Sequence, residues 1–428
     1  MLTKYFNLTE RQTDFKTEFI AGLTTFLTMS YIIFTNPAIL SETGMDKTAL
    51  IAVTCIISAL ATIAVGFFAD APIAMAPGMG LNAFFAYSLV ISGKINWQTA
   101  LGVVFISGLF FLILTLLGLR KKLVEAIPQS LIAAISVGIG LFITFSGLRN
   151  LGVIVASEST FVQAAPLRPT ILIGLAGLML MIFLEMKDVV GSLLIGIVFS
   201  SVLAAVFGYV KPPAEIVSMH IDIKQIAGKL DILAACKWGF FGSIFTLMFI
   251  DMFDSIGTLV ACSHMAGRRD SAGKIKDIDR LLTIDALATM AGAVLGTSTT
   301  TAYMESAAGI EQGGRTGLTS VITGLFFLLA VVFVPLVEVV PMYATAPALI
   351  MVGLFMMKEV RSIDFSDLQH AFPAFIIMVM IALSYSISTG LAFGFVAYTV
   401  IKTVSGNFKD VRPAMWIITA LSVVYFCV

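Results

Sequence analysis

The chain has 428 residues, 58% of them hydrophobic and 12% charged, with 26 basic and 26 acidic side chains and a mean hydropathy of +1.00. Typical soluble domains are about 25% charged, so this composition excludes a soluble enzyme and indicates a polytopic helical membrane protein, whose backbone is satisfied within its helices. The zero net charge gives no indication of a nucleic-acid partner.

Apolar runs alternate with short polar segments along the whole chain. A more polar stretch at 297–316 joins two of these runs at membrane depth, and counting it as a broken segment gives fourteen transmembrane segments. The predicted fold is therefore an all-α polytopic membrane protein. The thirteen apolar runs lie near residues 18–40, 49–68, 72–91, 99–118, 129–148, 170–186, 189–209, 238–262, 281–296, 317–337, 345–357, 372–388 and 390–404.

The first run carries hydroxyl groups in its middle. Thr24, Thr28 and Tyr31 share one face of the predicted helix, with Thr25 beside them. Threonines in membrane helices more often bond their own backbone than a ligand. A ligand-binding role for Thr24 and Thr28 therefore stays open beside a purely structural one.

The third run begins with an interruption. Pro72, Pro77, Gly78 and Gly80 fall within nine residues and prevent a continuous helix. Irregular backbone at membrane depth is tolerated only where it is buried in protein or lines a cavity. The alternative is a glycine-rich loop at the membrane surface. If the break lies inside the bundle, Asn82 at its end is a candidate ligand-binding residue.

The run from 238 to 262 contains two carboxylates, Asp251 and Asp254. Their i, i+3 spacing puts both on one side of a helix. An ionised carboxylate at mid-bilayer costs roughly 2.5–3.5 kcal/mol on insertion scales, so intramembrane acids are by default functional. A structural buried pair is the competing interpretation. We expect these aspartates to face a proton, a cation or a polar ligand.

A second interruption covers 296–309. Its consecutive threonines favour an extended backbone, and the residues after Glu305 favour a half-helix. Paired interrupted segments in two halves of a chain are the best sequence indication of a transporter's binding site. Glu305 is therefore a site candidate together with the aspartates and Asn82.

The chain repeats itself at about half its length. Residues 106–112 recur as 322–328, and residues 123–128 recur as 336–341, in the same order and with shared Gly, Glu and Pro. With seven segments per half, an odd number, the halves must have opposite orientation. The sequence therefore predicts a 7+7 inverted repeat, which is the usual architecture of secondary transporters.

The distribution of basic residues predicts which side of the membrane each connecting segment faces. Placing the N-terminus inside puts 18 of the 26 Lys and Arg residues on inside segments. We expect a multi-pass protein of the plasma (inner) membrane with both termini cytoplasmic. The predicted divisions are a first repeat at 1–209, an extracellular connector at 210–237, a second repeat at 238–404 and an interfacial tail at 405–428.

Four stretches together resemble the AzgA-like purine permeases of the nucleobase–cation symporter-2 (NCS2/NAT) superfamily. They are Gly22-Leu-Thr-Thr-Phe-Leu-Thr-Met-Ser-Tyr-Ile32, Ala76-Pro-Gly-Met-Gly-Leu-Asn-Ala-Phe-Phe85, Phe249-Ile-Asp-Met-Phe-Asp-Ser-Ile-Gly-Thr-Leu259 and Gly296-Thr-Ser-Thr-Thr-Thr-Ala-Tyr-Met-Glu-Ser306. The resemblance implies core and gate domains, with discontinuous third and tenth segments that each combine a short strand with a half-helix. It also implies proton-coupled uptake of adenine, guanine or hypoxanthine by an elevator-like alternating-access mechanism.

The resemblance also implies roles for individual residues. Asp251 and Glu305 would bind the base, and Asp254 would couple transport to protons. The backbone at Gly80 and Leu81 would complete the pocket with Asn82, and Met304, Thr24 and Thr28 are further candidates for contacts with the base.

A purine suits such a site because its ring N–H and exocyclic amine donate to carboxylates. Which of the three acids, Asp251, Asp254 or Glu305, carries the proton stays open, since coupled acids can share it. The expected partners are the purine, protons, membrane lipid and a second copy in a homodimer, with no nucleic acid, cofactor or metal.

Three alternative functions are weighed against this one. An anion transporter of the same fold class shares the inverted halves and interrupted helices, but three acids argue against an anionic substrate unless they are protonated. An intramembrane hydrolase using Asp251 and Asp254 lacks a second aspartate in a Gly-x-Gly-Asp context. A channel would pass current without saturating.

Overall fold

The structure, a computed structural model, describes residues 5–118, 127–211, 213, 215–218, 222–268 and 277–427. Eight of its helical stretches are long and apolar enough to cross a membrane, and four more apolar helical stretches are shorter, with 10–17 residues. The prediction of a mostly helical membrane protein is confirmed. The count of fourteen segments remains a prediction.

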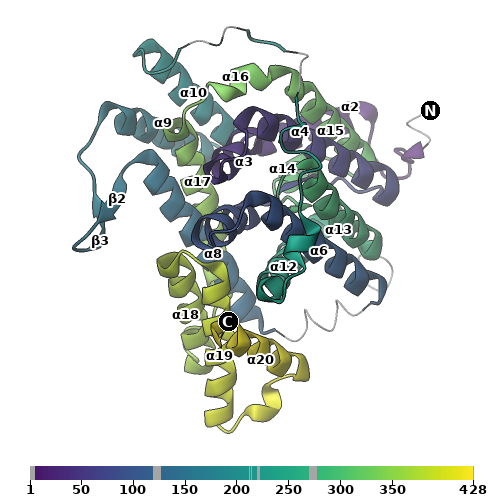
Figure 1. Cartoon of the computed structure of the whole chain (residues 1–428). Helices are drawn as coiled ribbons and strands as arrows, with labels where there is room; N and C mark the ends of the chain where they lie inside the picture. The colour runs from purple at the N-terminus through teal and green to yellow at the C-terminus, as the bar shows by residue number, and fades with distance from the viewer. Residues whose placement is uncertain are drawn as a thin grey trace.

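The helices divide into those before and those after the long connector 207–231 (Figure 1). Those before the long connector are α2 (Phe15–Met29), α3 (Ile32–Leu40), α4 (Lys47–Ala64), α5 (Met79–Ala83), α6 (Trp97–Leu116), α8 (Gln129–Leu151), α9 (Pro169–Glu185) and α10 (Ser192–Val206). Those after it are α11 (Ile232–Ala235), α12 (Phe241–Met265), α13 (Ile278–Leu295), α14 (Ser306–Glu311), α15 (Gly317–Ala330), α16 (Val334–Glu338), α17 (Met342–Met356), α18 (Leu368–Ser384), α19 (Ile387–Val404) and α20 (Pro413–Cys427). The strands are β1 (Met75–Pro77), β2 (Ile154–Ser157), β3 (Phe161–Ala164) and β4 (Thr300–Ala302).

Local sequence explains where many helices begin and change course. Asp14, Asp46 and Asn96 cap α2, α4 and α6 by accepting a backbone N–H three residues later. The first predicted run, 18–40, is divided into α2 and α3 by a turn at Ser30 and Tyr31. The predicted interfacial tail contains α20, and its position at the membrane surface stays a prediction.

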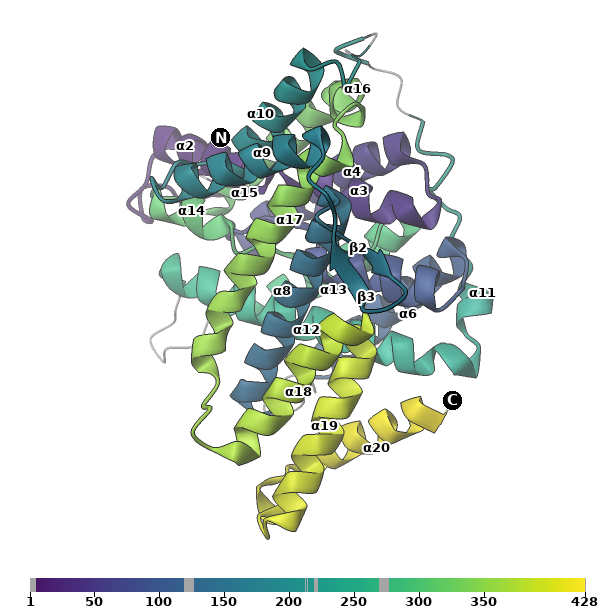
Figure 2. The same cartoon turned by 90° about the vertical axis from the view of Figure 1, so that its left-hand side faces the viewer.

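Two groups of helices pack mainly among themselves. The first helix group consists of α2, α3, α4, α5, α6, α12, α13, α14 and α15, and the second of α8, α9, α10, α17, α18 and α19. In the second group α17 runs beside α8, and α18 and α19 extend away from the first group (Figures 1 and 2). The β2–β3 hairpin projects from the end of α8 (Figure 2).

The two predicted interruptions meet inside the first helix group. Strand β1 precedes α5, strand β4 precedes α14, and the strands form an antiparallel pair in which Met75 lies opposite Ala302 and Pro77 opposite Thr300. Every residue of both strands is buried. The interruptions are therefore not surface loops: a two-stranded sheet satisfies their backbone where no helix can form.

Candidate functional site

Glu305 lies at the start of α14, directly after the buried sheet, and is half-buried. The Tyr31 hydroxyl, at the turn between α2 and α3, donates to Glu305 Oε1 at 2.6 Å. Tyr31 itself is only 2% exposed, so this hydrogen bond holds one carboxylate oxygen of Glu305 in place. The site thus joins the turn in the first run to the second interruption.

The two aspartates of α12 have different surroundings. Asp251 is buried, with 1% exposure, and its Oδ2 accepts from the Thr289 hydroxyl of α13 at 3.1 Å. Asp254 is exposed and interacts electrostatically with Glu305 and with Tyr31. An i, i+3 spacing separates two side chains by about 60° around the helix axis. That angle is enough to bury the carboxylate of Asp251 between helices and leave that of Asp254 exposed, where it interacts with Glu305.

The first interruption contributes Asn82, which is fully buried. Its Oδ1 accepts from the hydroxyl of Ser298, which precedes β4, so the two interruptions are also linked by side chains. Leu81 is fully buried, and a Cβ on Gly80 would lie 2.7 Å from Ile139 of α8. The start of α5 is therefore packed closely against the second helix group.

The remaining predicted contacts differ in accessibility. Met304 is 47% exposed and next to Glu305 in the chain. Thr28 donates to the carbonyls of Thr24 and Thr25, at 3.0 and 2.9 Å, and lies 3.4 Å from the Glu305 carbonyl. Thr24 is buried. Thr28 thus mainly bonds its own helix, and the roles of Thr24 and Thr28 toward a ligand remain predictions.

Three hydroxyl groups of the site were not singled out as ligands from the sequence. For Tyr31 the sequence shows only that it shares a helix face with the threonines. Ser255 bonds Thr301 of β4 at 2.7 Å, and Thr289 bonds both Asp251 and β4. Ser255 follows Asp251 by one helical turn, and this i, i+4 spacing was the only signal in the sequence for it.

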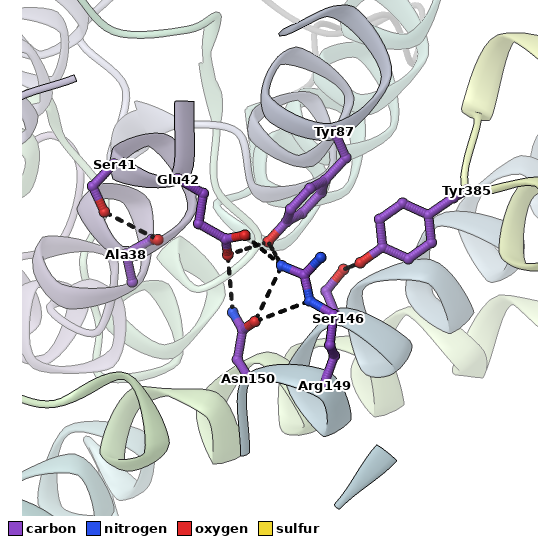
Figure 3. Close-up of polar contacts among 8 residues, drawn as sticks. All are labelled: Ala38, Ser41, Glu42, Tyr87, Ser146, Arg149, Asn150 and Tyr385. Carbon is purple, nitrogen blue, oxygen red and sulfur yellow. Dashed lines mark hydrogen bonds and ion pairs between the residues drawn. The ribbon is translucent and has the colours of Figure 1, made fainter. Parts of the chain in front are cut away.

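A separate polar cluster joins the two helix groups (Figure 3). Glu42, at the end of α3, forms an ion pair with Arg149 of α8, and Tyr87 donates to Glu42 at 2.7 Å. The Arg149 guanidinium lies over the Tyr87 ring at 5.0 Å, which is cation–π distance. The hydroxyl of Tyr385, between α18 and α19, bonds Ser146 of α8 at 2.8 Å. We call these five residues the Glu42–Arg149 cluster.

No group of three or more His, Cys, Asp or Glu side chains among the described residues is arranged to hold a metal ion. What the site offers is carboxylates and hydroxyls around a buried piece of extended backbone. Both kinds of group accept hydrogen bonds from N–H donors, and the carboxylates can also take up protons.

Comparison with known proteins assigns a family model, described as a permease family, to residues 16–425. The chain is 45% identical to a permease of Methanocaldococcus jannaschii, over 99% of this chain and 96% of the relative. It is 41% identical to the adenine permease AdeQ of Escherichia coli (98% and 95%) and 39% identical to the guanine/hypoxanthine permease PbuG of Bacillus subtilis (99% and 98%).

Solved structures of the same fold have much lower identity. The transmembrane domain of the cyanobacterial bicarbonate transporter BicA matches with a TM-score of 0.66 and 17% identity, covering 87% of this chain and 96% of that domain. Murine Slc26a9, an anion transporter solved in the inward-facing state, matches with a TM-score of 0.64 and 10% identity, covering 92% of this chain and 69% of that protein. These matches establish the fold alone.

Proposed function

The chain belongs to the permease family of nucleobase–cation symporters (NCS2/NAT), and we propose that it imports purine nucleobases (adenine, guanine or hypoxanthine) together with protons. It is a transporter and not an enzyme. The observation that carries the proposal is the meeting of two interrupted stretches in a buried sheet, with Asp254 and Glu305 beside it. The purines named for the Escherichia coli and Bacillus subtilis relatives support the substrate class.

In this proposal the base binds next to Glu305. Tyr31 occupies one side of the carboxylate, and a carboxylate has room for further donors, such as a purine ring N–H or exocyclic amine. We assign Asp251 to the base as well, together with Asn82, the backbone at Gly80 and Leu81, and the neighbouring Met304, Thr24 and Thr28. The half-burial of Glu305 is compatible with access from solvent.

Proton coupling is assigned to the three acids as a set. Asp254 and Glu305 interact electrostatically, so placing a proton on one removes repulsion between them. If the loaded site reorients only after protonation, proton and purine cross together. A carboxylate in apolar surroundings takes up a proton at higher pH than one in water, which suits this role near neutral pH.

We further propose fourteen segments in two inverted repeats of seven, with the first helix group as the core domain and the second as the gate. The edges of the sheet support this symmetry: Thr62 of α4 bonds Met75 thirteen residues later, and Thr289 of α13 bonds Thr300 eleven residues later. Elevator-like alternating access would move the core past the gate within the plasma (inner) membrane, with both termini cytoplasmic.

Domain movement of this kind must break the Glu42–Arg149 cluster. We expect Arg149→Ala to speed labelling of Met304→Cys by a membrane-impermeant maleimide about two- to fivefold, because a partly exposed ion pair is worth up to about 1 kcal/mol. The assay uses a background without the native cysteines and compares Arg168→Ala, another arginine at a helix end. Equal labelling in the two variants would contradict a role of the cluster in holding the two helix groups together.

Uptake of radiolabelled adenine, guanine, hypoxanthine and uracil, with and without a protonophore, tests the proposed function. We expect saturable uptake of at least one purine that the protonophore abolishes. Uptake of no base, together with bicarbonate uptake, would instead favour an anion carrier of the same fold. Purine uptake that the protonophore leaves unchanged would remove the proton from the mechanism and keep the substrate.

A further inference from the structure

A threonine hydroxyl closes each outer edge of the buried sheet. Pro77, which has no N–H, lies opposite Thr300 at a pair without ladder hydrogen bonds, so the N–H and C=O of Thr300 point outward. Thr289 Oγ1 accepts from the Thr300 N–H at 3.2 Å and donates to its carbonyl at 3.0 Å. Thr62 serves Met75 on the opposite edge in the same way, at 2.9 and 3.0 Å.

The two edges differ in one respect. The Thr289 hydroxyl also lies 3.1 Å from Asp251 Oδ2, whereas Thr62 bonds only Met75 within the described part of the chain. A hydroxyl has a single proton to donate, so the Asp251 carboxylate and the Thr300 carbonyl compete for it. Thr62 and Thr289 are both fully buried, so water does not supply a second donor to the Asp251 carboxylate or the Thr300 carbonyl.

We propose that Thr289 is a positioning residue that links the protonation of Asp251 to the backbone of strand β4, an inference that rests on the proton symport proposed above. With Asp251 ionised, Thr289 donates to the carboxylate, the stronger acceptor. When Asp251 takes up a proton, its new O–H donates to Thr289 Oγ1, and the Thr289 proton turns to the Thr300 carbonyl. The only bond formed is the O–H on Asp251.

This change in hydrogen bonding at Thr300 affects the segment that carries Glu305. Strand β4 leads into α14 within three residues, and Glu305 lies at that junction. One more hydrogen bond to the Thr300 carbonyl fixes the strand more firmly to α13. A proton on Asp251 therefore changes how firmly the segment that carries Glu305 is held, without any direct contact between the two acids.

Other charged groups face this region and must be separated from Asp251 in a test. Helix α13 carries Asp285, which is buried one turn before Thr289 and so shares its face. Helices α5 and α6 and strand β4 carry no Asp, Glu, Lys, Arg or His. Helix α12 and the other elements packed against α12 carry the remaining charged or titratable acidic and basic side chains. These are Asp254, His264, Asp279, Arg280, Glu305, Glu311 and Lys402.

The test measures purine uptake by the full-length protein as a function of external pH. Thr289→Val and the matched control Thr62→Val each remove one edge hydroxyl with little change of shape. We expect Thr289→Val to move the pH of half-maximal uptake upward by about one pH unit, because ionised Asp251 loses a donated hydrogen bond. Thr62→Val should leave that pH unchanged, Thr289→Ser should restore it, and the shift should persist beside Asp285→Asn.

Several results would overturn the inference. If the pH of half-maximal uptake is the wild-type value in both Thr289→Val and Thr62→Val, Thr289 only satisfies the backbone of β4 and has no role in the titration. Loss of the shift beside Asp285→Asn would assign the titration to Asp285. If Thr289→Val does not reach the membrane, Thr289→Cys, a weaker donor, replaces it and must show a shift in the same direction. Wild-type uptake that is insensitive to pH and protonophore would refute the symport itself, before any variant is compared.

Discussion

Glu305→Gln is expected to lower the purine uptake efficiency, kcat/KM, by at least about 100-fold, because one change removes a charged acceptor and leaves donors unpaired. The glutamine has the same size, but its NH2 group faces the Tyr31 hydroxyl or the base, both of which donate. It also cannot take up a proton near neutral pH. Initial rates over a range of purine concentrations, normalised to protein at the cell surface, measure the effect.

Two further variants test whether the loss of uptake is due to the Glu305 carboxylate itself. Glu311→Gln changes an exposed carboxylate at the other end of α14 and should leave uptake unchanged. Tyr31→Phe removes only the 2.6 Å hydrogen bond to Glu305, and we expect about a tenfold loss. Wild-type kinetics in Glu305→Gln would exclude Glu305 from the site, and an equal loss in Glu311→Gln would assign the effect to the stability of α14.

The interruptions were predictable because they depend on local chemistry. Pro72, Pro77 and the neighbouring glycines cannot continue a helix, and consecutive threonines favour extended backbone. Their pairing as β1 and β4 was not predictable from the residues alone. More than two hundred residues separate the partners, for example Met75 and Ala302, and such short strands carry no hydrophobic pattern that fixes a register.

Asp251 and Asp254 were identifiable because charge in an apolar run is conspicuous at any position, and Glu305 because it follows the threonines of the second interruption. Their surroundings could not be predicted in the same way. The burial of Asp251 depends on Thr289 of another helix, and the orientation of Glu305 depends on Tyr31 at a turn in the first run. Thr289 sits in an ordinary apolar run, where nothing local distinguishes it from a packing residue.

Gly66, in the helical turn Val65–Ala69 directly after α4, lies close against Gly317 at the start of α15, and this close approach predicts a large loss of stability when Gly317 is replaced. A Cβ on Gly317 would overlap the carbonyl oxygen of Gly66, and a Cβ on Gly66 would lie 2.6 Å from the Gly317 carbonyl oxygen. The approach brings acids to the N-terminus of α15, whose first N–H groups have no partner within the helix. Asp70 accepts from Gly317 N–H at 2.8 Å, and Glu18 accepts from Thr319 N–H at 3.1 Å.

Gly317→Ala should therefore destabilise the protein by roughly 2–3 kcal/mol, because backbone has to move and the added methyl group has no free space. In purified protein we expect a melting temperature lower by about 5 °C. Gly257→Ala is the matched control, since a Cβ on Gly257 in α12 meets nothing within 4 Å. Alanine there favours the helix by about 0.5–1 kcal/mol, so the melting temperature should stay or rise. Equal melting temperatures in Gly317→Ala and wild type would mean that α15 starts farther from α4 than the structure has it, and that Asp70 and Glu18 do not hold its N-terminus.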